Sequence, residues 1–220
     1  MPGGFFCYII GNIKLEEIRS GNMLKIKEQI ETFQPYNEQE KQDKKVLLKY
    51  LEHGKTVFTR EDETAHMTAS AWVVNQDRSK VLMIYHNIYD SWAWTGGHAD
   101  GETDLLAVAV REVKEETGIQ MVKPVTEEIL SLEILPVAGH VKHGKYVSSH
   151  LHLNITYLLE TDDKYELAVK PDENSGVKWF TPEGAIQACS EPWMRGIYQK
   201  LNEKCGLTPK DMGKDLEKSR

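Results

Sequence analysis

The chain has 220 residues, with 27 Lys or Arg against 34 Asp or Glu, so its formal net charge is −7. This length suits one domain with an appendage. The acidic balance argues against a protein that coats a nucleic-acid polymer, because that function needs a basic face. The three cysteines form no CxxC pair, which favours neither a disulfide framework nor a structural zinc site. No run approaches the ~18 apolar residues of a membrane span. We therefore expect a cytoplasmic protein without a membrane partner.

Residues 1–22 show neither helical spacing nor cap signals. We expect them to be a disordered or artefactual extension, with Met23 as the true start. Residues 19–22 can be encoded by codons that resemble a bacterial ribosome-binding site just before that methionine. The alternative is a real N-terminal segment whose apolar side chains pack on the domain.

Residues 23–55 are predicted to form a helical N-terminal arm. Apolar residues recur with roughly helical spacing from Met23 to Phe33. A second helix is expected over 37–53, with Gly54 as its C-terminal cap.

From residue 56 to 205 the pattern predicts one α/β domain, followed by a polar tail over 206–220. Short β-rich runs alternate with turn residues, so the strands come in hairpins and favour a sandwich over a doubly wound sheet. Strands are expected over 71–74, 81–85, around Trp92 and Trp94 up to the Gly96-Gly97 pair, and near 127–135, 150–159 and 177–180. Helices are expected over 103–117, 183–189 and 193–204.

The helix over 103–117 carries acidic residues on its apolar side. One side of it holds Leu105, Val108, Ala109, Glu112, Glu115 and Glu116. Like charges at this spacing repel one another, and burying them costs more. A divalent cation would convert the repulsion into attraction, and oxygen ligands favour Mg²⁺ or Mn²⁺ over zinc. A solvated, salt-bridged helix surface is the alternative.

The segment from Gly97 to Ile119 resembles the signature of the Nudix hydrolases, Gly-x5-Glu-x7-Arg-Glu-U-x-Glu-Glu-x-Gly-U, where U is a bulky aliphatic residue. The matching positions are Gly97, Arg111, Glu112, Val113, Glu115, Glu116, Gly118 and Ile119. Thr103 departs from the signature, because it stands where the first Glu belongs. In the family that Glu mainly braces the junction between loop and helix, so Glu102 or Asp100 is expected to replace it.

The resemblance, which covers about residues 66–190, implies a Nudix-type α/β/α sandwich on a mixed sheet. It implies Mg²⁺-dependent hydrolysis of a diphosphate linkage in a nucleoside diphosphate derivative, with Mn²⁺ as the other candidate ion. The implied metal site comprises Gly97, Glu112, Glu115 and Glu116. The implied catalytic residues are Arg111, Glu115, Glu116 and Glu173. Glu173 lies in a segment similar to the family's acidic loop, and a plain turn acid is its alternative.

Trp92, His98 and His152 are the expected substrate-binding residues. His152 alternates with His150 on one predicted strand face, for which an ordinary polar sheet face is the alternative. A zinc site is not expected there, because no Cys or carboxylate joins these histidines at ligand spacing. Pro136, 17 residues past Ile119, favours an ADP-ribose-like substrate by its similarity to relatives that cleave this compound.

Two other functions stay open at this point. The chain could be a non-catalytic nucleotide-sensing domain on the same fold, or an enzyme similar to prenyl diphosphate isomerases. The intact set of acidic residues disfavours both. The expected partner is a small nucleotide substrate, and a homodimer remains open.

Overall fold

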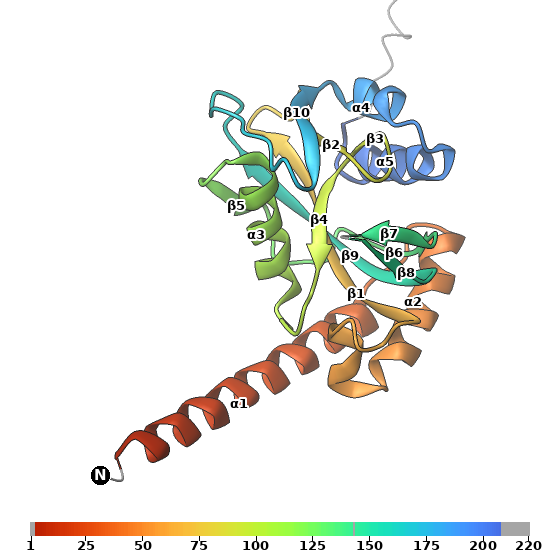
Figure 1. Cartoon of the computed structure of the whole chain (residues 1–220). Helices are drawn as coiled ribbons and strands as arrows, with labels where there is room; N and C mark the ends of the chain where they lie inside the picture. Colours follow the sequence, from red (N-terminus) through yellow and green to blue (C-terminus); the bar gives the residue numbers. More distant parts are fainter. Residues whose placement is uncertain (1–2, 143, 208–220) are drawn as a thin grey trace, which may run out of the picture.

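The computed structural model describes residues 3–142 and 144–207, and in these ranges five α-helices surround a mixed sheet (Figure 1). The helices are α1 (Gly3–Thr32), α2 (Glu38–Leu51), α3 (Leu105–Thr117), α4 (Pro182–Ala188) and α5 (Pro192–Lys204), with a 3-10 turn η1 (Gly54–Phe58). The strands are β1 (Ala65–Asn75), β2 (Val81–His86), β3 (Ser91–Ala93), β4 (Thr95–His98), β5 (Val122–Pro124), β6 (Ser131–Val137), β7 (His140–Lys142), β8 (Lys145–Val147), β9 (His150–Thr161) and β10 (Asn174–Phe180). No helix in the described part of the chain has the length and hydropathy of a membrane span.

The main sheet runs in the order β10-β2-β1-β9-β5, with β3 paired to β2, β4 to β1 and β6 to β9. The pair β1–β9 is parallel and the other pairs are antiparallel, so the sheet is mixed as expected. β1 is buried along its whole length and forms the centre of the sheet. The predicted hairpin is confirmed by the pairing of Val73 with Leu82. A separate two-stranded sheet joins β7 and β8.

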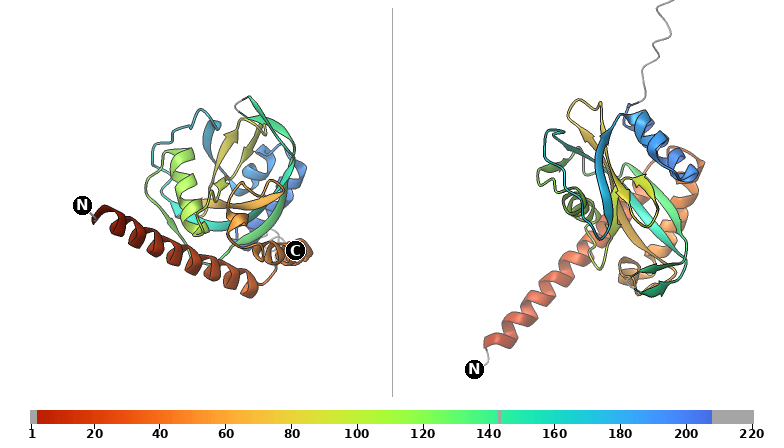
Figure 2. Two further views of the ribbon diagram at one scale, coloured as in Figure 1. Left: turned by 60° about the horizontal axis from the view of Figure 1, so that its bottom comes forward. Right: turned by 45° about the horizontal axis from the view of Figure 1, so that its top comes forward.

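Successive side chains of β1 enter two different hydrophobic cores. Val73 packs in the core that contains Val108 of α3, whereas Trp72 packs in the core that contains Tyr198 of α5. This alternation follows from the two-residue period of a strand. Helices therefore cover both faces of the sheet, and the expected α/β/α sandwich is confirmed (Figures 1 and 2).

The strand expected to carry both Trp92 and Trp94 is divided in the structure. Trp92 lies in β3, which pairs with β2, whereas Trp94 stands between β3 and β4, and β4 pairs with β1. Because of this division, the two indoles have different neighbours. It also places Gly96 and Gly97 of β4 against the centre of the sheet, where Gly97 pairs with Ala69.

Helix α1 differs most from the sequence prediction. It covers residues 3–32 without a break, so the segment expected to be irregular is helical and continues into the predicted helix. No proline interrupts the chain between residues 3 and 34, which allows the helix to extend. Its C-terminal part buries Ile26 and Ile30, while its N-terminal part projects away from the sheet (Figures 1 and 2). That Met23 is the true start stays a prediction. The predicted tail over 206–220 lies outside the described residues, apart from Gly206 and Leu207.

A buried charge network ties α2 to the rest of the fold. The Glu40 side chain is fully buried and contacts Lys200 at 3.2 Å and Lys204 at 2.8 Å, both on α5. Lys200 also pairs with buried Glu133 of β6 at 2.9 Å. Burial acts to raise the pKa of Glu40, but the hydrogen bonds from Lys204 and from the amide of Tyr36 outweigh it and lower the pKa. Glu40 is therefore held as an ion inside the fold.

Candidate active site

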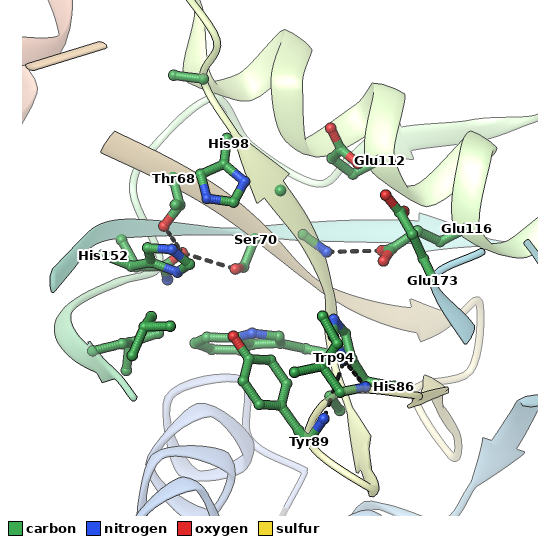
Figure 3. Close-up of a pocket in the computed structure, with 18 of the residues that line it drawn as sticks. Thr68, Ser70, His86, Tyr89, Trp94, His98, Glu112, Glu116, His152 and Glu173 are labelled. Carbon is green, nitrogen blue, oxygen red and sulfur yellow. Dashed lines mark hydrogen bonds between the residues drawn. The ribbon is translucent and has the colours of Figure 1, made fainter. Parts of the chain in front are cut away.

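A cavity of about 620 Å³ lies beside β4 and collects side chains from β1, α3, β9 and the segments around β2 and β10 (Figure 3). The residues that line the cavity fall into three groups. The carboxylate wall comprises Glu112, Glu115, Glu116 and Glu173. The histidine wall comprises His98, His152, Thr68, Ser70 and Asn154. The aromatic wall comprises His86, Tyr89 and Trp94.

Glu102 braces the junction between the glycine loop and α3. Its Oε1 accepts hydrogen bonds from the backbone amides of Thr103 at 2.7 Å and Asp104 at 2.9 Å. Asp100 instead forms an ion pair with Arg60 at 2.6 Å. Of the two residues expected to replace the missing motif glutamate, Glu102 is thus the one that contacts the start of the helix.

The cap residues fix the length and position of α3. The Asp104 side chain accepts a hydrogen bond from the amide of Ala107 at 3.0 Å, which caps the N-terminus. Gly118 ends the helix with a φ of 77°, a left-handed conformation that favours glycine. These two residues set which turn of α3 faces the cavity, and the predicted end at Thr117 is confirmed.

Glu112 and Glu116 are buried on the cavity side of α3, at 8% and 2% exposure. The backbone amide of Gly96 donates to Glu116 Oε2 at 2.9 Å, and Arg111 donates to Glu112 Oε1 at 2.9 Å. Burial raises the pKa of Glu116 well above its usual range and also raises that of Glu112. The ionised forms of both side chains are therefore costly unless positive charge lies beside them.

Glu115 differs from its two neighbours. The sequence places it on the same side of α3, yet its side chain is 45% exposed and pairs with Lys170 at 3.2 Å. Its Oε1 lies 3.8 Å from Nε of Arg111. Lys170 also pairs with Glu173 at 2.9 Å, so one lysine joins α3 to the segment before β10. Burial acts to lower the pKa of Lys170, but these two ion pairs outweigh it and raise the pKa.

Gly97 lies against the carboxylate wall. A Cβ atom at this position would stand 2.5 Å from the carboxyl carbon of Glu112, which is closer than any real contact. Glycine leaves room for the Glu112 carboxylate beside β4, which a side chain at this position would force to move. In Figure 3 the side chains of Glu112, Glu116 and Glu173 converge on the same side of the cavity.

The carboxylate wall suits a divalent cation. Its donors are all oxygen atoms, which is the ligand set that Mg²⁺ and Mn²⁺ prefer. Two of its acids, Glu112 and Glu116, are buried with raised pKa values, so a cation beside them would lower the cost of their ionisation. The expected ligands Glu112, Glu115 and Glu116 thus have the right chemistry for the ion.

The cavity as a whole is acidic. Eight carboxylate side chains line it against four cationic ones. The cationic side chains are Arg19, Arg60, Arg111 and Lys170. An anionic ligand entering such a cavity would meet net repulsion in the absence of an added cation.

The predicted substrate contacts fall into two groups. His98 and His152 line the cavity, on β4 and β9. Trp92 does not line it, because its indole packs edge-on against Phe180 and Tyr85, with ring centroids 4.9 and 5.4 Å away. The division of the predicted strand explains this difference. Trp94 is buried at 8% exposure in the core that contains Tyr198, and it also lines the cavity.

The aromatic wall includes residues that the sequence did not single out. His86 and Tyr89 stack with ring centroids 4.3 Å apart, and Tyr89 is 41% exposed. Their spacing across the turn after β2 was the available signal, since only two residues lie between His86 and Tyr89 in the chain. An exposed aromatic pair at a cavity is a suitable surface for a planar ring.

A family model described as NUDIX domain matches residues 64–201. A solved structure of a Caenorhabditis elegans Ap4A hydrolase in a binary complex is 20% identical with a TM-score of 0.47, over 64% of this chain and 97% of that chain. The Escherichia coli dihydroneopterin triphosphate pyrophosphohydrolase is 17% identical with a TM-score of 0.48, over 62% of this chain and 92% of that chain. A NUDIX-family hydrolase from Clostridium perfringens is 21% identical with a TM-score of 0.43, over 63% of this chain and 97% of that chain. Among curated proteins, none matches the chain.

Proposed function

The chain belongs to the NUDIX family, and from that premise we propose that it hydrolyses the diphosphate linkage of a nucleoside diphosphate derivative with the help of Mg²⁺. The observation that carries the proposal is the charge of the cavity, where eight carboxylates stand against four cationic side chains. A diphosphate is itself anionic, so it can occupy this cavity only together with cations. The carboxylate wall supplies the oxygen ligands for them.

The residues of the carboxylate wall have different roles in this proposal. Bound Mg²⁺ would screen the diphosphate, acidify a water molecule and stabilise the leaving phosphate. Glu116 is held in place by the amide of Gly96, which fixes one carboxylate oxygen while the other remains available. Glu173, which shares Lys170 with Glu115, is the candidate general base or additional ligand. Arg111 orients Glu115 from one turn earlier in α3.

The remaining walls suit the rest of the substrate. We place the nucleobase against Tyr89 and Trp94, because stacking on aromatic rings tolerates any base. His98 and His152 then face the part of the substrate beyond the diphosphate. Pro136 also lines the cavity, which supports the ADP-ribose-like substrate class expected from its sequence position.

The test is a hydrolysis assay over a panel of nucleotide compounds with and without Mg²⁺. The panel contains ADP-ribose, nucleotide sugars, diadenosine polyphosphates and nucleoside triphosphates, with phosphomonoester products detected through a coupled phosphatase. We expect ADP-ribose-like compounds to give the highest kcat/KM and EDTA to abolish turnover. Glu128→Gln, on an exposed side chain outside the cavity, is the matched control for carboxylate substitutions.

The same assay separates the two alternatives. Tight nucleotide binding without any product would favour a sensing domain. Isomerisation of a prenyl diphosphate without cleavage would favour the isomerase-like enzyme. Neither outcome is expected, because the signature residues Glu112, Glu115 and Glu116 are present.

A further inference from the structure

Four histidines from three strands meet at the edge of the cavity. His66 lies on β1, His98 on β4, and His150 and His152 on β9. Their potential ligand atoms all lie within 4.8 Å of one another. We call these four residues the histidine cluster.

Strand register brings the cluster together. His66 stands directly opposite His152 in the parallel pair β1–β9. His98 stands opposite Thr68 in the pair β1–β4, and Thr68 is two residues from His66 on the same face of the strand. His150 is likewise two residues from His152. All four imidazoles therefore project from one face of the sheet, and His66 lies within ring-contact distance of the other three.

Backbone carbonyls fix the protonation of two of these rings. Nδ1 of His66 donates to the carbonyl of Asp62 at 3.0 Å, and Nδ1 of His150 donates to the carbonyl of Ser148 at 2.8 Å. A carbonyl oxygen only accepts hydrogen bonds, so Nδ1 of each ring is a donor, and in the neutral ring the lone pair is on Nε2. A second contact that holds a histidine ring in this tautomer is typical of metal-binding histidines.

The lone pair of His66 has no hydrogen-bond partner. The His66 side chain is 5% exposed, and its Nε2 is buried without a donor. A buried acceptor without a partner costs free energy unless something binds to it. The unpartnered Nε2 of His66 therefore suggests a bound ligand that accepts an electron pair, such as a metal cation.

The other rings are arranged to share such a ligand. Nε2 of His150 and Nε2 of His152 lie 3.2 Å apart. Two nitrogen ligands of a tetrahedral ion with bonds of about 2.05 Å stand about 3.3 Å apart.

We propose that the histidine cluster binds one divalent transition-metal ion of the Zn²⁺ type, at a site separate from the carboxylate wall. The nitrogen donors select such ions, whereas the oxygen donors of the carboxylate wall select Mg²⁺ or Mn²⁺. His98 and His152 line the cavity, so the ion reaches the cluster through it.

The direct test is titration of the full chain with Co²⁺ and then Zn²⁺. The protein carries no polyhistidine tag, is stripped with a chelator, and is kept in excess Mg²⁺ so that the carboxylate wall is occupied by a hard cation. We expect one equivalent of Co²⁺ to give the visible absorption of a tetrahedral nitrogen site, and Zn²⁺ to displace it. Zn²⁺ should also raise the melting temperature, because it binds the assembled site of the folded chain more tightly than the scattered histidines of the unfolded chain.

His150→Gln is the main variant, and His140→Gln is its matched control. In both residues Nδ1 bonds the carbonyl two positions earlier in the chain, but His140 lies outside the cluster. We expect His150→Gln to weaken Zn²⁺ binding by on the order of 10²-fold or more, and His140→Gln to leave it unchanged. His66→Gln is the second ligand variant, and circular dichroism identifies which variants are folded.

A double variant, Glu112→Gln with Glu116→Gln, separates the two sites. It removes buried donors of the carboxylate wall, and we expect Co²⁺ and Zn²⁺ still to bind with full stoichiometry. The proposal is overturned if the folded wild-type chain takes up no stoichiometric Co²⁺ or Zn²⁺. It is also overturned if folded His150→Gln binds as tightly as wild type, or if the double variant loses the ion.

Discussion

The carboxylate wall and the histidine cluster meet beside β4. They differ in how far apart their residues lie in the sequence. Gly97 adjoins Glu112, and the next residue, His98, belongs to the cluster. The wall takes most of its donors from one helix, within five residues of sequence. The cluster takes its donors from three strands, and depends on the parallel pairing that sets His66 opposite His152.

The two regions also differ in charge. The wall includes two buried acids, Glu112 and Glu116, whose pKa values are raised by burial, whereas the cluster includes His66 and His152, whose pKa values are lowered by burial. Desolvation raises the pKa of Glu116 and lowers that of His152, because in each case it disfavours the charged form. One physical cause therefore shifts the pKa values of Glu116 and His152 in opposite directions.

The largest expected effect comes from Glu116→Gln, which isolates the role of the wall. Loss of this buried charge should lower kcat by on the order of 10²–10⁴, since it removes a metal ligand or base. The variant should melt at a higher temperature than wild type in EDTA, because the costly buried ion is gone. Kinetics with varied Mg²⁺ and a thermal melt measure both changes. Near-normal kcat with normal Mg²⁺ dependence would contradict the assignment.

Glu173→Ala tests whether the wall extends beyond α3. We expect kcat to fall by about 10- to 10²-fold, as for loss of an auxiliary base or ligand. Stability should change by only about 0–1 kcal/mol, because the partly exposed pair with Lys170 contributes little and Lys170 keeps Glu115. Glu166→Ala, on an exposed side chain outside the cavity, is the control. Unchanged kinetics would make Glu173 a simple turn acid.

Stability as a function of pH should separate the two regions directly. Glu116 binds its proton more tightly in the folded chain, so its contribution to the free energy of unfolding falls as pH rises above about 4.5, the carboxyl value of the unfolded chain. His152 binds its proton less tightly in the folded chain, so its contribution is complete above about 6.5 and is lost as pH falls below that value. Melting temperatures in EDTA from pH 4 to 8 measure the sum.

Two variants test which residue causes each slope of the profile of stability against pH. Glu116→Gln should flatten the decline towards high pH, and His152→Gln should flatten the decline towards low pH. If both variants keep the wild-type profile, the two buried groups do not control the pH response.

The smallest effect is expected from a chain that starts at Met23. It loses the hydrogen bond from Thr103 Oγ1 to the carbonyl of Arg19, which is 3.1 Å long. Such a bond contributes about 1 kcal/mol, and a protein of this size would then melt about 2–4 °C lower. Both sites should keep their metal affinities. A drop of many degrees, or loss of activity, would show that the first 22 residues are needed by the fold.

The sequence predicted the wall better than the cluster for a physical reason. Helical spacing is local, so the positions of Glu112 and Glu116 and the end of α3 at Gly118 follow from the order of residues alone. The exposure of Glu115 did not follow, because Lys170, far along the chain, holds it outward. Likewise, the alternation of His150 and His152 was visible, but its meeting with His66 and His98 depends on strand pairing between distant segments.

The fold shows the same contrast. The hairpin β1–β2 was predicted because its turn residues lie between its strands. The division between Trp92 and Trp94 was missed. Trp92 lies in β3, which pairs with β2, whereas β4 after Trp94 pairs with β1, and the order of residues does not show these pairings. Helix α1 was shortened in the prediction, because apolar spacing identifies only the part of a helix that is packed against a core.

The buried pair of Glu40 and Lys200 has a consequence for the order in which parts of the chain can fold during synthesis. Synthesis completes α2 early, but the lysines that neutralise Glu40 lie on α5, the last described helix to leave the ribosome. Until then, docking α2 onto β6 would bury Glu40 and Glu133 without a positive charge, which is strongly unfavourable. The nascent chain is therefore kept from settling into a partial fold, and α2 docks on the sheet only after α5 has emerged.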